Sequence, residues 1–365
     1  MGHDHVGRLA RAREGAGAAG LDGLILSPSP DLIYLAGYDA PLLERLTVLV
    51  LRTTADPVLI VPELERPRAA SSPAGQLVEI RSWRDGEDAY ELVRTLIGAG
   101  HAYGASDRMW AAHLLQLQEA LPDAKFVPSS TVLSALRERK DEGEIELLRR
   151  AGQSADEAFA RVCSDGLEGR SERDVARSLE EFLVATGTDT PAFTIVGSGP
   201  NSASPHHEPG ERVIKAGDTV VLDFGGRVGG YCSDITRTVV VGERPAEVEE
   251  VHGLVREAQE AALGTAAPGV PAEEVDRAAR SVIEKAGYGD AFVHRTGHGI
   301  GLEEHEAPYI VEGNDETLEP GMCFSIEPGI YLEGRFGVRI EDIVAIMPGG
   351  PVRLNDAPRD LSTVG

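Results

Sequence analysis

In the first third of the chain some hydrophobic residues form short continuous runs, while others recur at helical spacing. Apolar runs of strand length predict buried β-strands, and a period near 3.6 residues predicts amphipathic helices. The predicted strands are residues 21–27, 45–52, 56–62 and 77–83, and the predicted helices are residues 88–100 and 111–122. Strands that alternate with helices predict an α/β domain. This part contains no GxGxxG or phosphate-binding loop, and its acids and histidines follow no ligand spacing, so we expect it to support a site located elsewhere.

A second domain is predicted to begin with the highly charged segment RERKDEGEIELLRRA. We place the boundary near Leu136, which gives domains of residues 1–135 and 136–365. The second domain twice shows a pair of amphipathic helices together with strand-rich and glycine-rich sequence. The predicted helix pairs are residues 144–162 with 172–187 and residues 246–266 with 271–287. This order predicts an α+β domain that arose by duplication.

Two predicted β-hairpins carry pairs of acidic residues. In VVLDFGGRVGGYCSDITRT, a fold about the 228–229 peptide places Asp223 opposite Asp234, because a hairpin pairs positions whose numbers have a constant sum. In FSIEPGIYLEGRFGVRIEDI, a fold about the glycine of EGR places Glu327 opposite Glu341. Like charges across a strand pair repel, so four adjacent carboxylates stay ionised only if cations offset them. The hairpins therefore predict a site for two metal ions.

The two hairpins also resemble each other. The glycine, acid and glycine of GDTVVLDFG recur 104 positions later in GMCFSIEPG. Turns of this kind are common before apolar strands, but that does not explain an acid at the equivalent place in both. A duplicated fold with a pseudo-twofold axis would bring the two acid pairs face to face.

Composition and charge exclude several other classes of protein. The chain has 365 residues, 42% of them hydrophobic, and a formal net charge of −25. The length suits two domains, and the negative charge disfavours nucleic acid and anionic membranes as partners. No signal core or membrane-spanning run of apolar residues is present, and three scattered cysteines indicate a reducing cytoplasm. His3 and His5 are expected to lie in a flexible polar tail.

Five motifs resemble those of one peptidase family. They are, in order, SPHHEPG, LDFGGRVGGYCSDITRT, HRTGHGIGLEEHEAP, SIEPGIY and GVRIEDI. They resemble the M24-type metallopeptidases, the family of Xaa-Pro dipeptidase (prolidase), aminopeptidase P and methionine aminopeptidase. The resemblance covers roughly Leu136 to Met347 and implies the pita-bread fold, with internal pseudo-twofold symmetry. The preceding α/β domain resembles the creatinase-type N-terminal domain of the proline-specific branch.

The resemblance also implies a complete set of metal ligands. Asp223, Asp234, His298, Glu327 and Glu341 stand at the family's five ligand positions. By resemblance, the two aspartates hold one metal, His298 and Glu327 hold the other, and Asp234 and Glu341 bridge both. Independently, oxygen-rich ligation with one imidazole suits Mn(II), Co(II), Fe(II) or Zn(II), and we expect two Mn(II) ions. The glycines of GHGIG are expected to keep side chains away from a metal at His298.

Three residues are implied to act on the substrate. His206 and His305 would hydrogen-bond the substrate amide and the tetrahedral oxyanion, and deliver a proton to the departing nitrogen. Glu327 would also serve as general base. His207 adjoins His206, but the motif position after Pro205 favours His206.

Other residues near the motifs have mainly structural interpretations. His294 and His252 are expected to be structural or exposed, and Tyr231 to be a turn residue without a required function. Arg339 is expected to orient a carboxylate ligand, since it lies two residues before Glu341.

The sequence thus predicts a dinuclear metallopeptidase that acts on Xaa-Pro bonds of short peptides. Xaa-Pro dipeptidase is the first expectation, and aminopeptidase P acting on longer peptides is the alternative. Some dipeptidases of the family carry an arginine just after the HE motif that clamps the substrate carboxylate, whereas HEAPY has Tyr309 there. A metal-dependent hydrolase of a small non-peptide substrate and a metal-free binding module stay open, although five intact ligands argue against the latter. We also expect a homodimer in which the N-terminal domain of one subunit closes the active-site mouth of another.

Overall fold

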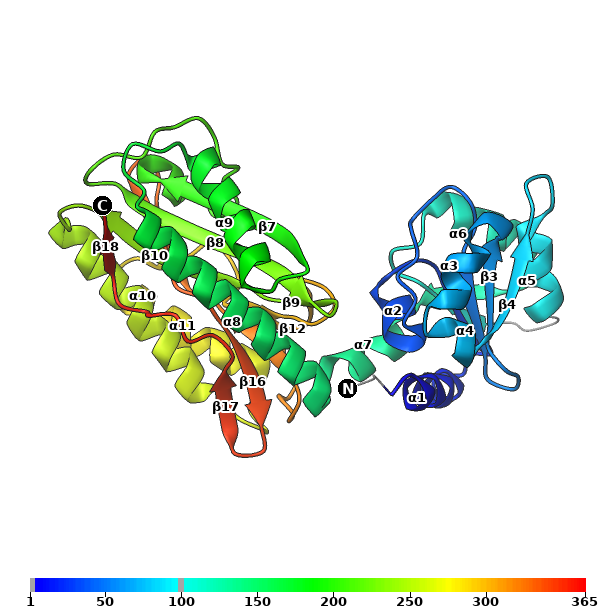
Figure 1. Cartoon of the computed structure of the whole chain (residues 1–365). Coiled ribbons are helices and arrows are strands. Elements are labelled where there is room, and N and C mark those ends of the chain that lie inside the picture. The colour runs from blue at the N-terminus through cyan, green and yellow to red at the C-terminus, as the bar shows by residue number, and fades with distance from the viewer. Residues whose placement is uncertain (1–3, 98–101) are drawn as a thin grey trace. The chain divides into compact units, whose positions relative to one another are not determined.

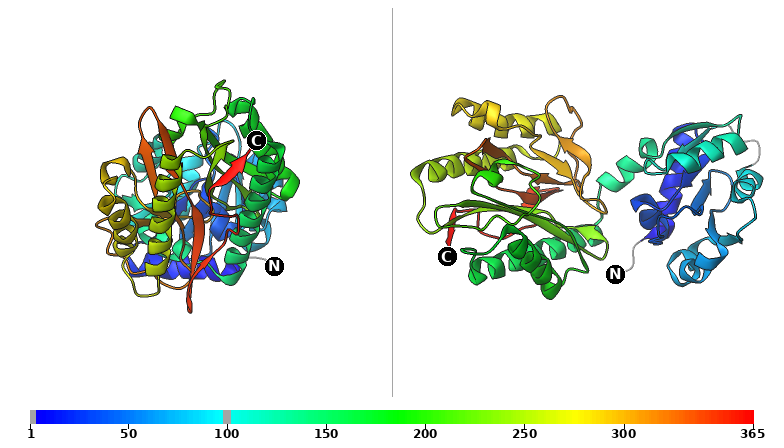
Figure 2. Two further views of the ribbon diagram at one scale, coloured as in Figure 1. Left: turned by 90° about the vertical axis from the view of Figure 1, so that its left-hand side faces the viewer. Right: turned by 90° about the horizontal axis from the view of Figure 1, so that it is seen from above.

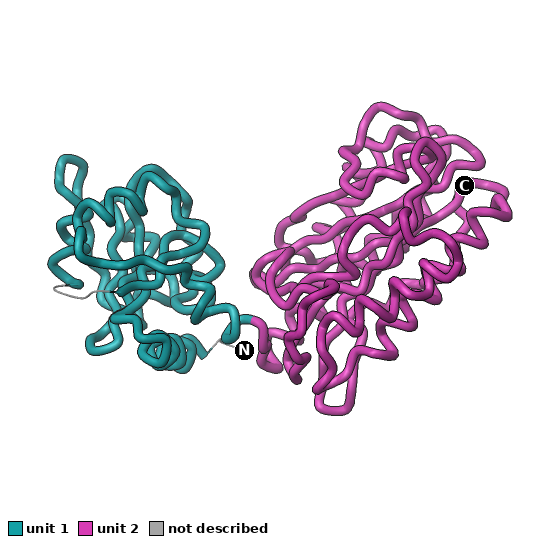
Figure 3. The backbone as a smooth tube through the Cα atoms, turned by 180° about the vertical axis from the view of Figure 1, so that it is seen from behind, with its two compact units in different colours: residues 1–137 teal, residues 138–365 magenta. Residues whose placement is uncertain are grey.

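The computed structural model describes residues 4–97 and 102–365. The chain divides into two compact units, residues 1–137 and 138–365, so the division falls two residues after the boundary that the sequence predicts (Figures 1 and 3). Across the residues that the structure describes, no helix combines the length and the apolar character needed to cross a membrane.

The first unit is a mixed β-sheet with helices, in the strand order β4-β3-β2-β1-β5-β6. The strands are β1 (Gly23–Leu26), β2 (Val48–Arg52), β3 (Val58–Pro62), β4 (Glu79–Trp83), β5 (Ala102–Ala105) and β6 (Lys125–Pro128). The helices are α1 (His5–Ala18), α2 (Pro30–Ala36), α3 (Arg66–Ser71), α4 (Ala74–Leu77), α5 (Ala89–Ile97), α6 (Ala111–Ala120) and α7 (Ser130–Glu138). All four predicted strands and both predicted helices are confirmed as far as the described residues reach, whereas β5 and β6 were not predicted.

The N-terminal segment is helical, and the prediction of a flexible polar tail is wrong for the residues that are described. His5 starts α1, is buried, and its Nδ1 lies 3.1 Å from the carbonyl oxygen of Tyr34. The guanidinium of Arg8 lies 4.2 Å from the centre of the Tyr34 ring, a cation–π distance. These contacts, together with the buried Leu9, Ala12 and Ala16, hold the segment in place. His3 lies outside the described residues.

The second unit has two main β-sheets, each covered by a pair of helices. One sheet has the order β18-β10-β8-β7, with β9 paired to β8, and the other has the order β12-β11-β13-β16-β17. In the right-hand view of Figure 2, the green pair α8 and α9 and the yellow pair α10 and α11 lie on opposite sides of the strands. The four predicted helices are confirmed as α8 (Glu142–Asp165), α9 (Glu172–Thr186), α10 (Ala246–Thr265) and α11 (Ala272–Lys285). Each pair shares a separate hydrophobic core with its own sheet.

The strands of the second unit form these sheets and one additional hairpin. The first sheet contains β7 (Thr190–Ser198), β8 (Thr219–Val228), β9 (Tyr231–Cys232), β10 (Ile235–Val241) and β18 (Ser362–Val364). The second contains β11 (Gly297–Gly299), β12 (Glu306–Ile310), β13 (Cys323–Ile326), β16 (Asp342–Met347) and β17 (Gly350–Arg353). The hairpin is β14 (Gly329–Leu332) with β15 (Phe336–Arg339).

Equivalent backbone hydrogen bonds recur in the two halves of this unit. The amide of Gly169 donates to the carbonyl of Ile214, and the amide of Gly269 donates to the carbonyl of Leu318, both at 2.9 Å. These bonds link the start of the second helix of each pair to the segment that leads into the acidic hairpin. They are the structural counterpart of the predicted duplication.

The first acidic hairpin turns one residue later than predicted. Gly229 and Gly230 occupy the turn with φ values of 58° and 86°, as two central residues of a tight hairpin turn require. Asp223 is therefore paired with Thr236, so the prediction that it lies directly opposite Asp234 is wrong. The register differs by two positions, an even number, which keeps both acids on the same face of the hairpin.

The second acidic hairpin has the predicted register. Gly329 of β14 pairs with Arg339 of β15, and Ile326 of β13 pairs with Asp342 of β16. In both pairs the residue numbers have the same sum as in the predicted pair Glu327 and Glu341. Glu327 and Glu341 fall between these ladders at the same sum. A bridge between Glu341 and Thr236 of β10 joins the two hairpins. The four acids thus lie where the two halves of the unit meet.

Candidate metal centre

The structure brings together all five residues that the sequence predicts as metal ligands. Asp223, Asp234 and Glu341 form one group, and His298, Glu327 and Glu341 form another. Within each group the candidate ligand atoms lie within 4.8 Å of one another. Glu341 belongs to both groups, so the arrangement is that of two adjacent cation sites with a shared carboxylate.

His298 is held at the centre by two neighbouring strands that approach its backbone closely. A Cβ atom at Gly297 would lie 1.8 Å from the carbonyl oxygen of Ser325, and one at Gly299 would lie 2.1 Å from that of Ala307. Neither glycine has a positive φ. These glycines are therefore required for strand packing, which differs from the expectation that they clear space beside the imidazole.

Three carboxylate oxygens at this site are buried without a hydrogen-bond partner. They are Oδ1 of Asp223, Oδ1 of Asp234 and Oε1 of Glu341. A buried carboxylate oxygen without a partner is costly, and buried charges in proteins are normally paired or bound to metal. The orphaned oxygens all belong to the predicted ligand set, so the residues present fit divalent cations.

The acids also oppose one another's ionisation. Burial raises the pKa of Asp234 and of Glu341 well above the usual range, and the charges of neighbouring carboxylates raise both further. Burial also raises the pKa of Asp223, although Arg339 opposes this shift. Each of these shifts favours the protonated form, and bound cations would oppose them by favouring the carboxylates.

Glu327 differs from the other acids because it lies beside the imidazole. Nε2 of His298 lies 3.2 Å from Oε1 of Glu327 and 3.7 Å from Oδ2 of Asp234. Burial opposes ionisation of Glu327, but the hydrogen bond and charge of His298 outweigh it and lower its pKa to about 2. Nδ1 of His298 lies 3.1 Å from the carbonyl oxygen of Gly299, which accepts its proton and leaves Nε2 facing the acids.

Arg339 orients a carboxylate, as predicted, and the ligand that it contacts is Asp223. Its guanidinium donates to Oδ2 of Asp223 and, at 3.0 Å, to the hydroxyl of Thr236. Thr236 in turn donates to Oε2 of Glu341 at 2.6 Å. Arg339 also donates to the hydroxyl of Tyr331 at 2.7 Å. Sequence reasoning missed Thr236 and Tyr331, although the correct register of the first hairpin would have placed Thr236 beside Asp223.

His294 ends the hydrogen-bond chain that starts at Arg339. Its Nδ1 lies 2.7 Å from the carbonyl of Arg295, so Nε2 accepts the proton of the Tyr331 hydroxyl at 2.8 Å. Burial lowers the pKa of His294, in keeping with a neutral ring. His294 was expected to be either structural or exposed, and these contacts give it a structural role.

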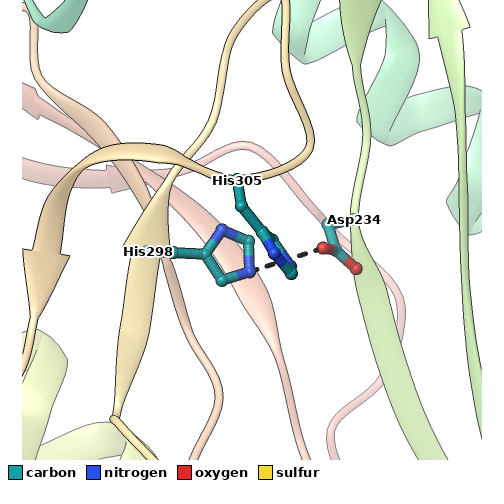
Figure 4. A group of neighbouring side chains, drawn as sticks. All are labelled: Asp234, His298 and His305. Atoms are coloured by element: carbon teal, nitrogen blue, oxygen red, sulfur yellow. Dashed lines mark ion pairs between the residues drawn. The ribbon is translucent and has the colours of Figure 1, made fainter. Parts of the chain in front are cut away.

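His305 lies at the accessible side of the centre. Its ring centroid is 4.1 Å from that of His298, and the two rings point toward the carboxylate of Asp234 (Figure 4). These three residues form a further candidate ligand group in which His305 alone is exposed. Desolvation, together with the charges of His298 and Arg295, lowers the pKa of His305 to about 4. It is therefore uncharged at neutral pH.

The other histidines have different environments. His207 lies 2.8 Å from Oε2 of Glu172, which is fully buried at the start of α9. His206 is exposed on the adjacent turn and is absent from every candidate ligand group of the described residues. His252 is buried in α10, and Tyr231 is buried and donates to Glu144 at 2.6 Å.

The loop that carries His305 is anchored by two ion pairs. Nζ of Lys140 lies 2.6 Å from Oε1 of Glu306, and these side chains are only 1% and 8% exposed. A guanidinium nitrogen of Arg227 lies 2.7 Å from Oε1 of Glu304. His305 is therefore flanked on both sides by anchored residues.

These features define a candidate centre for two metal ions, and comparison with known families shows the class of protein that carries it. The chain belongs to metallopeptidase family M24, whose model matches residues 146–348. Residues 8–139 match the creatinase/prolidase N-terminal domain. The architecture is thus an α/β domain followed by a catalytic domain of the pita-bread fold.

The chain aligns with dipeptidases over nearly their whole length. The chain is 47% identical over 360 residues to a Mycobacterium tuberculosis protein named "Probable dipeptidase PepE", covering 98% of this chain and 96% of that protein. It is 38% identical over 340 residues to a Lactobacillus helveticus Xaa-Pro dipeptidase, covering 91% and 92%. A solved structure of recombinant prolidase from Thermococcus sibiricus matches with a TM-score of 0.95 and 40% identity over 100% of both chains.

Proposed function

We propose that this protein is an Xaa-Pro dipeptidase that uses two divalent metal ions. The observation that carries the proposal is the pair of ligand groups that share Glu341 and contain three buried carboxylate oxygens without protein partners. The names of the relatives support the Xaa-Pro preference. An Xaa-Pro bond lacks the amide N–H and has a fixed φ, so it calls for a dedicated site.

The predicted ligand assignment gives each residue a place at the centre. Asp223 and Asp234 would hold one ion, His298 and Glu327 the other, with Asp234 and Glu341 shared. We favour Mn(II), and Co(II), Fe(II) and Zn(II) accept the same donors. The chemistry that two such ions supply is polarisation of the scissile carbonyl and a lowered pKa of bound water.

Residues at the accessible side would handle the protons and the substrate. Glu327 would accept a proton from the attacking water, as the family resemblance implies, and it is half-buried while the other three acids are buried. The neutral imidazole of His305 donates one N–H hydrogen bond, which suits the substrate amide or the tetrahedral oxyanion. His206 would share these roles or deliver the proton to the departing nitrogen.

Product analysis of the Mn(II)-loaded protein on Ala-Pro, Ala-Pro-Ala and Ala-Ala tests the proposal. We expect rapid cleavage of Ala-Pro, slow cleavage of the other two peptides, and loss of activity on chelation. Equal cleavage of Ala-Ala would contradict the proline preference. Full activity after removal of metal would contradict the dinuclear mechanism.

Aminopeptidase P activity on longer peptides is the second candidate. The observation that favours it is Tyr309, which stands where some dipeptidases of the family have a carboxylate-binding arginine. Release of alanine from Ala-Pro-Ala at a rate equal to or above that of Ala-Pro cleavage would identify this activity.

We also propose that the protein is a cytoplasmic homodimer whose N-terminal domain restricts access to the active site. In support, no candidate ligand group lies among the described residues of the first unit, and all three cysteines are free. Deletion of residues 1–135 should relax the length selectivity or abolish activity. Light scattering that finds a fully active monomer, or fractionation that finds the protein outside the cytoplasm, would contradict this proposal.

A further inference from the structure

We propose that Glu172 is a positioning residue that holds His206 in place for its action on the substrate. The inference rests on the proposed function and deepens it, since it concerns a histidine of that site. Glu172 is the first residue of α9, and its side chain is 0% exposed. A carboxylate this deeply buried needs hydrogen-bond donors or a cation around it. Its donors come from residues 198–210, the segment that carries His206.

Both oxygens of the Glu172 carboxylate accept hydrogen bonds from this segment. Oε1 accepts from the backbone amide and the hydroxyl of Ser198, at 2.8 and 2.6 Å. Oε2 accepts from Nε2 of His207 at 2.8 Å and from the amide of Gly210 at 3.2 Å. The side-chain amide of Asn201 donates to both oxygens, at 3.0 and 3.2 Å. The carboxylate therefore ties together the two ends and the middle of the segment.

These hydrogen bonds also keep Glu172 ionised. Burial opposes its ionisation, but the bonds from Ser198, His207 and Asn201 outweigh burial and lower the pKa of Glu172. Hydrogen bonds to an ionised acceptor are about twice as strong as neutral ones. Five donor groups on one anion thus give the segment a firm anchor, and loss of any one of them leaves four.

The same segment contacts the strand that supports the metal centre. The amide of Gly337 in β15 donates to the hydroxyl of Ser202 at 2.8 Å, and a Cβ atom at Gly337 would lie 2.1 Å from the carbonyl oxygen of Ser202. Nη2 of Arg339 lies 3.5 Å from the carbonyl oxygen of Pro205, and the same nitrogen donates to a predicted ligand carboxylate. His206 directly follows Pro205, so its backbone is held beside the ligands.

His206 needs such an anchor because its own side chain is exposed. A side chain that acts on a substrate must stay accessible, so its position has to be fixed through its neighbours. A displacement of about 1 Å in a catalytic group can cost about 100-fold in rate. The buried carboxylate of Glu172 supplies the fixed point, and its bond to His207 holds the residue next to His206.

The other half of the catalytic unit contains a similar anchor. Asp276 of α11 is buried, and its Oδ1 accepts from the backbone amide and the hydroxyl of Thr296 at 3.1 and 2.8 Å. Thr296 lies two residues before His298, a predicted metal ligand. Both α9 and α11 are the second helix of their pair. In each half, a buried acid of this helix thus fixes a segment that carries a histidine of the site.

A double-mutant cycle on Ala-Pro tests whether Glu172 acts through His206. Glu172→Gln keeps the shape of the side chain but replaces one accepting oxygen with a donor. We expect it to lower kcat of the Mn(II)-loaded protein by about 10- to 100-fold at unchanged metal content. In the His206→Ala background the same change should cost less than about twofold, because the residue that it positions is gone. Equal losses in both backgrounds would overturn the inference.

Two control variants define the specificity of the effect. Glu180→Gln removes the same charge from an exposed position of α9 and should leave kcat unchanged. Asp276→Asn should lower the metal content, because its anchored segment leads to His298. Loss of metal in Glu172→Gln would also overturn the inference, since Glu172 would then support the centre itself and not His206.

Hydrogen exchange measured by mass spectrometry tests the anchor without turnover. We expect the backbone amides of residues 198–210 to exchange faster in Glu172→Gln, and those of residues 296–305 to be unchanged. Asp276→Asn should give the opposite pattern. Unchanged exchange of residues 198–210 in Glu172→Gln would overturn the inference. If Glu172→Gln does not fold, Asn201→Ala removes a single donor group and should show the same pattern with smaller losses. If no Xaa-Pro peptide is cleaved, the proposed function is refuted, while the exchange measurements still decide whether Glu172 holds the segment of His206.

Discussion

Loss of the buried ammonium of Lys140 should destabilise the catalytic unit and displace the loop of His305. Lys140→Met keeps most of the side-chain volume but removes the ammonium that lies 2.6 Å from the carboxylate of Glu306, which is 8% exposed. Breaking a buried ion pair on one side costs about 3–5 kcal/mol, and no discount for solvent screening applies to side chains this buried. For a unit of roughly 150–250 residues this lowers the unfolding midpoint by about 6–20 °C.

The double variant Lys140→Met/Glu306→Gln separates charge from packing. It removes both charges, so we expect it to recover at least about 2 kcal/mol of the loss in the single variant.

Differential scanning calorimetry of the catalytic-unit transition measures these changes, and metal content with kcat on Ala-Pro measures the effect on the loop. Since Glu306 directly follows His305, we expect a lower kcat at unchanged metal content in Lys140→Met. A loss below about 1 kcal/mol, or a double variant as unstable as the single one, would refute the view that this pair is held by its charges.

Four further predictions concern the ligands and the histidines. Glu341→Gln should remove both ions, measured by elemental analysis, because Glu341 belongs to both ligand groups; one retained equivalent would exclude the bridging role. His305→Ala should lower kcat at unchanged metal content, while His207→Ala should mainly reduce thermal stability, by about 1–3 kcal/mol, through its lost bond to buried Glu172. Burial lowers the pKa of His252 from 6.5 to about 4. Between these pH values the unfolded chain binds a proton at His252 and the folded chain does not. The free energy of unfolding should therefore decrease as the pH falls from 6.5 to about 4, by up to about 3 kcal/mol. His252→Gln should flatten this part of the denaturation profile, and an unchanged slope would contradict the assignment.

Residue patterns predicted the elements of the fold, but not all of their pairings. The turn of the first hairpin was predicted one residue too early. The sequence does not show which residues of the turn adopt positive φ, and in the structure these are Gly229 and Gly230. The second hairpin has a single glycine at its centre, so the position of its turn was predicted correctly. Strands β5 and β6 were missed because four-residue segments such as Ala102–Ala105 carry too little hydrophobic periodicity.

The centre itself could be predicted because its ligands stand in short, distinctive motifs. Most contacts around the ligands could not be predicted, since they join distant parts of the chain. Lys140 and Glu306 are 166 positions apart, and Arg339 and Asp223 are 116 apart. Arg339 was expected to orient a carboxylate, but only the folded chain shows that this carboxylate belongs to Asp223 and that Lys140 is buried with Glu306.

The equivalent hydrogen bonds of the two halves bear on how such a centre originated. Asp223 and Asp234 belong to one half, and Glu327 and Glu341 to the other, so neither half alone holds more than two of the four acids. An ancestral chain with a single copy would therefore have completed a dinuclear centre only by association of two identical molecules about a twofold axis. Fusion of the two copies would have allowed each copy to change independently. The imidazole of His298, which only one half contributes, is a difference that two identical molecules could not have had.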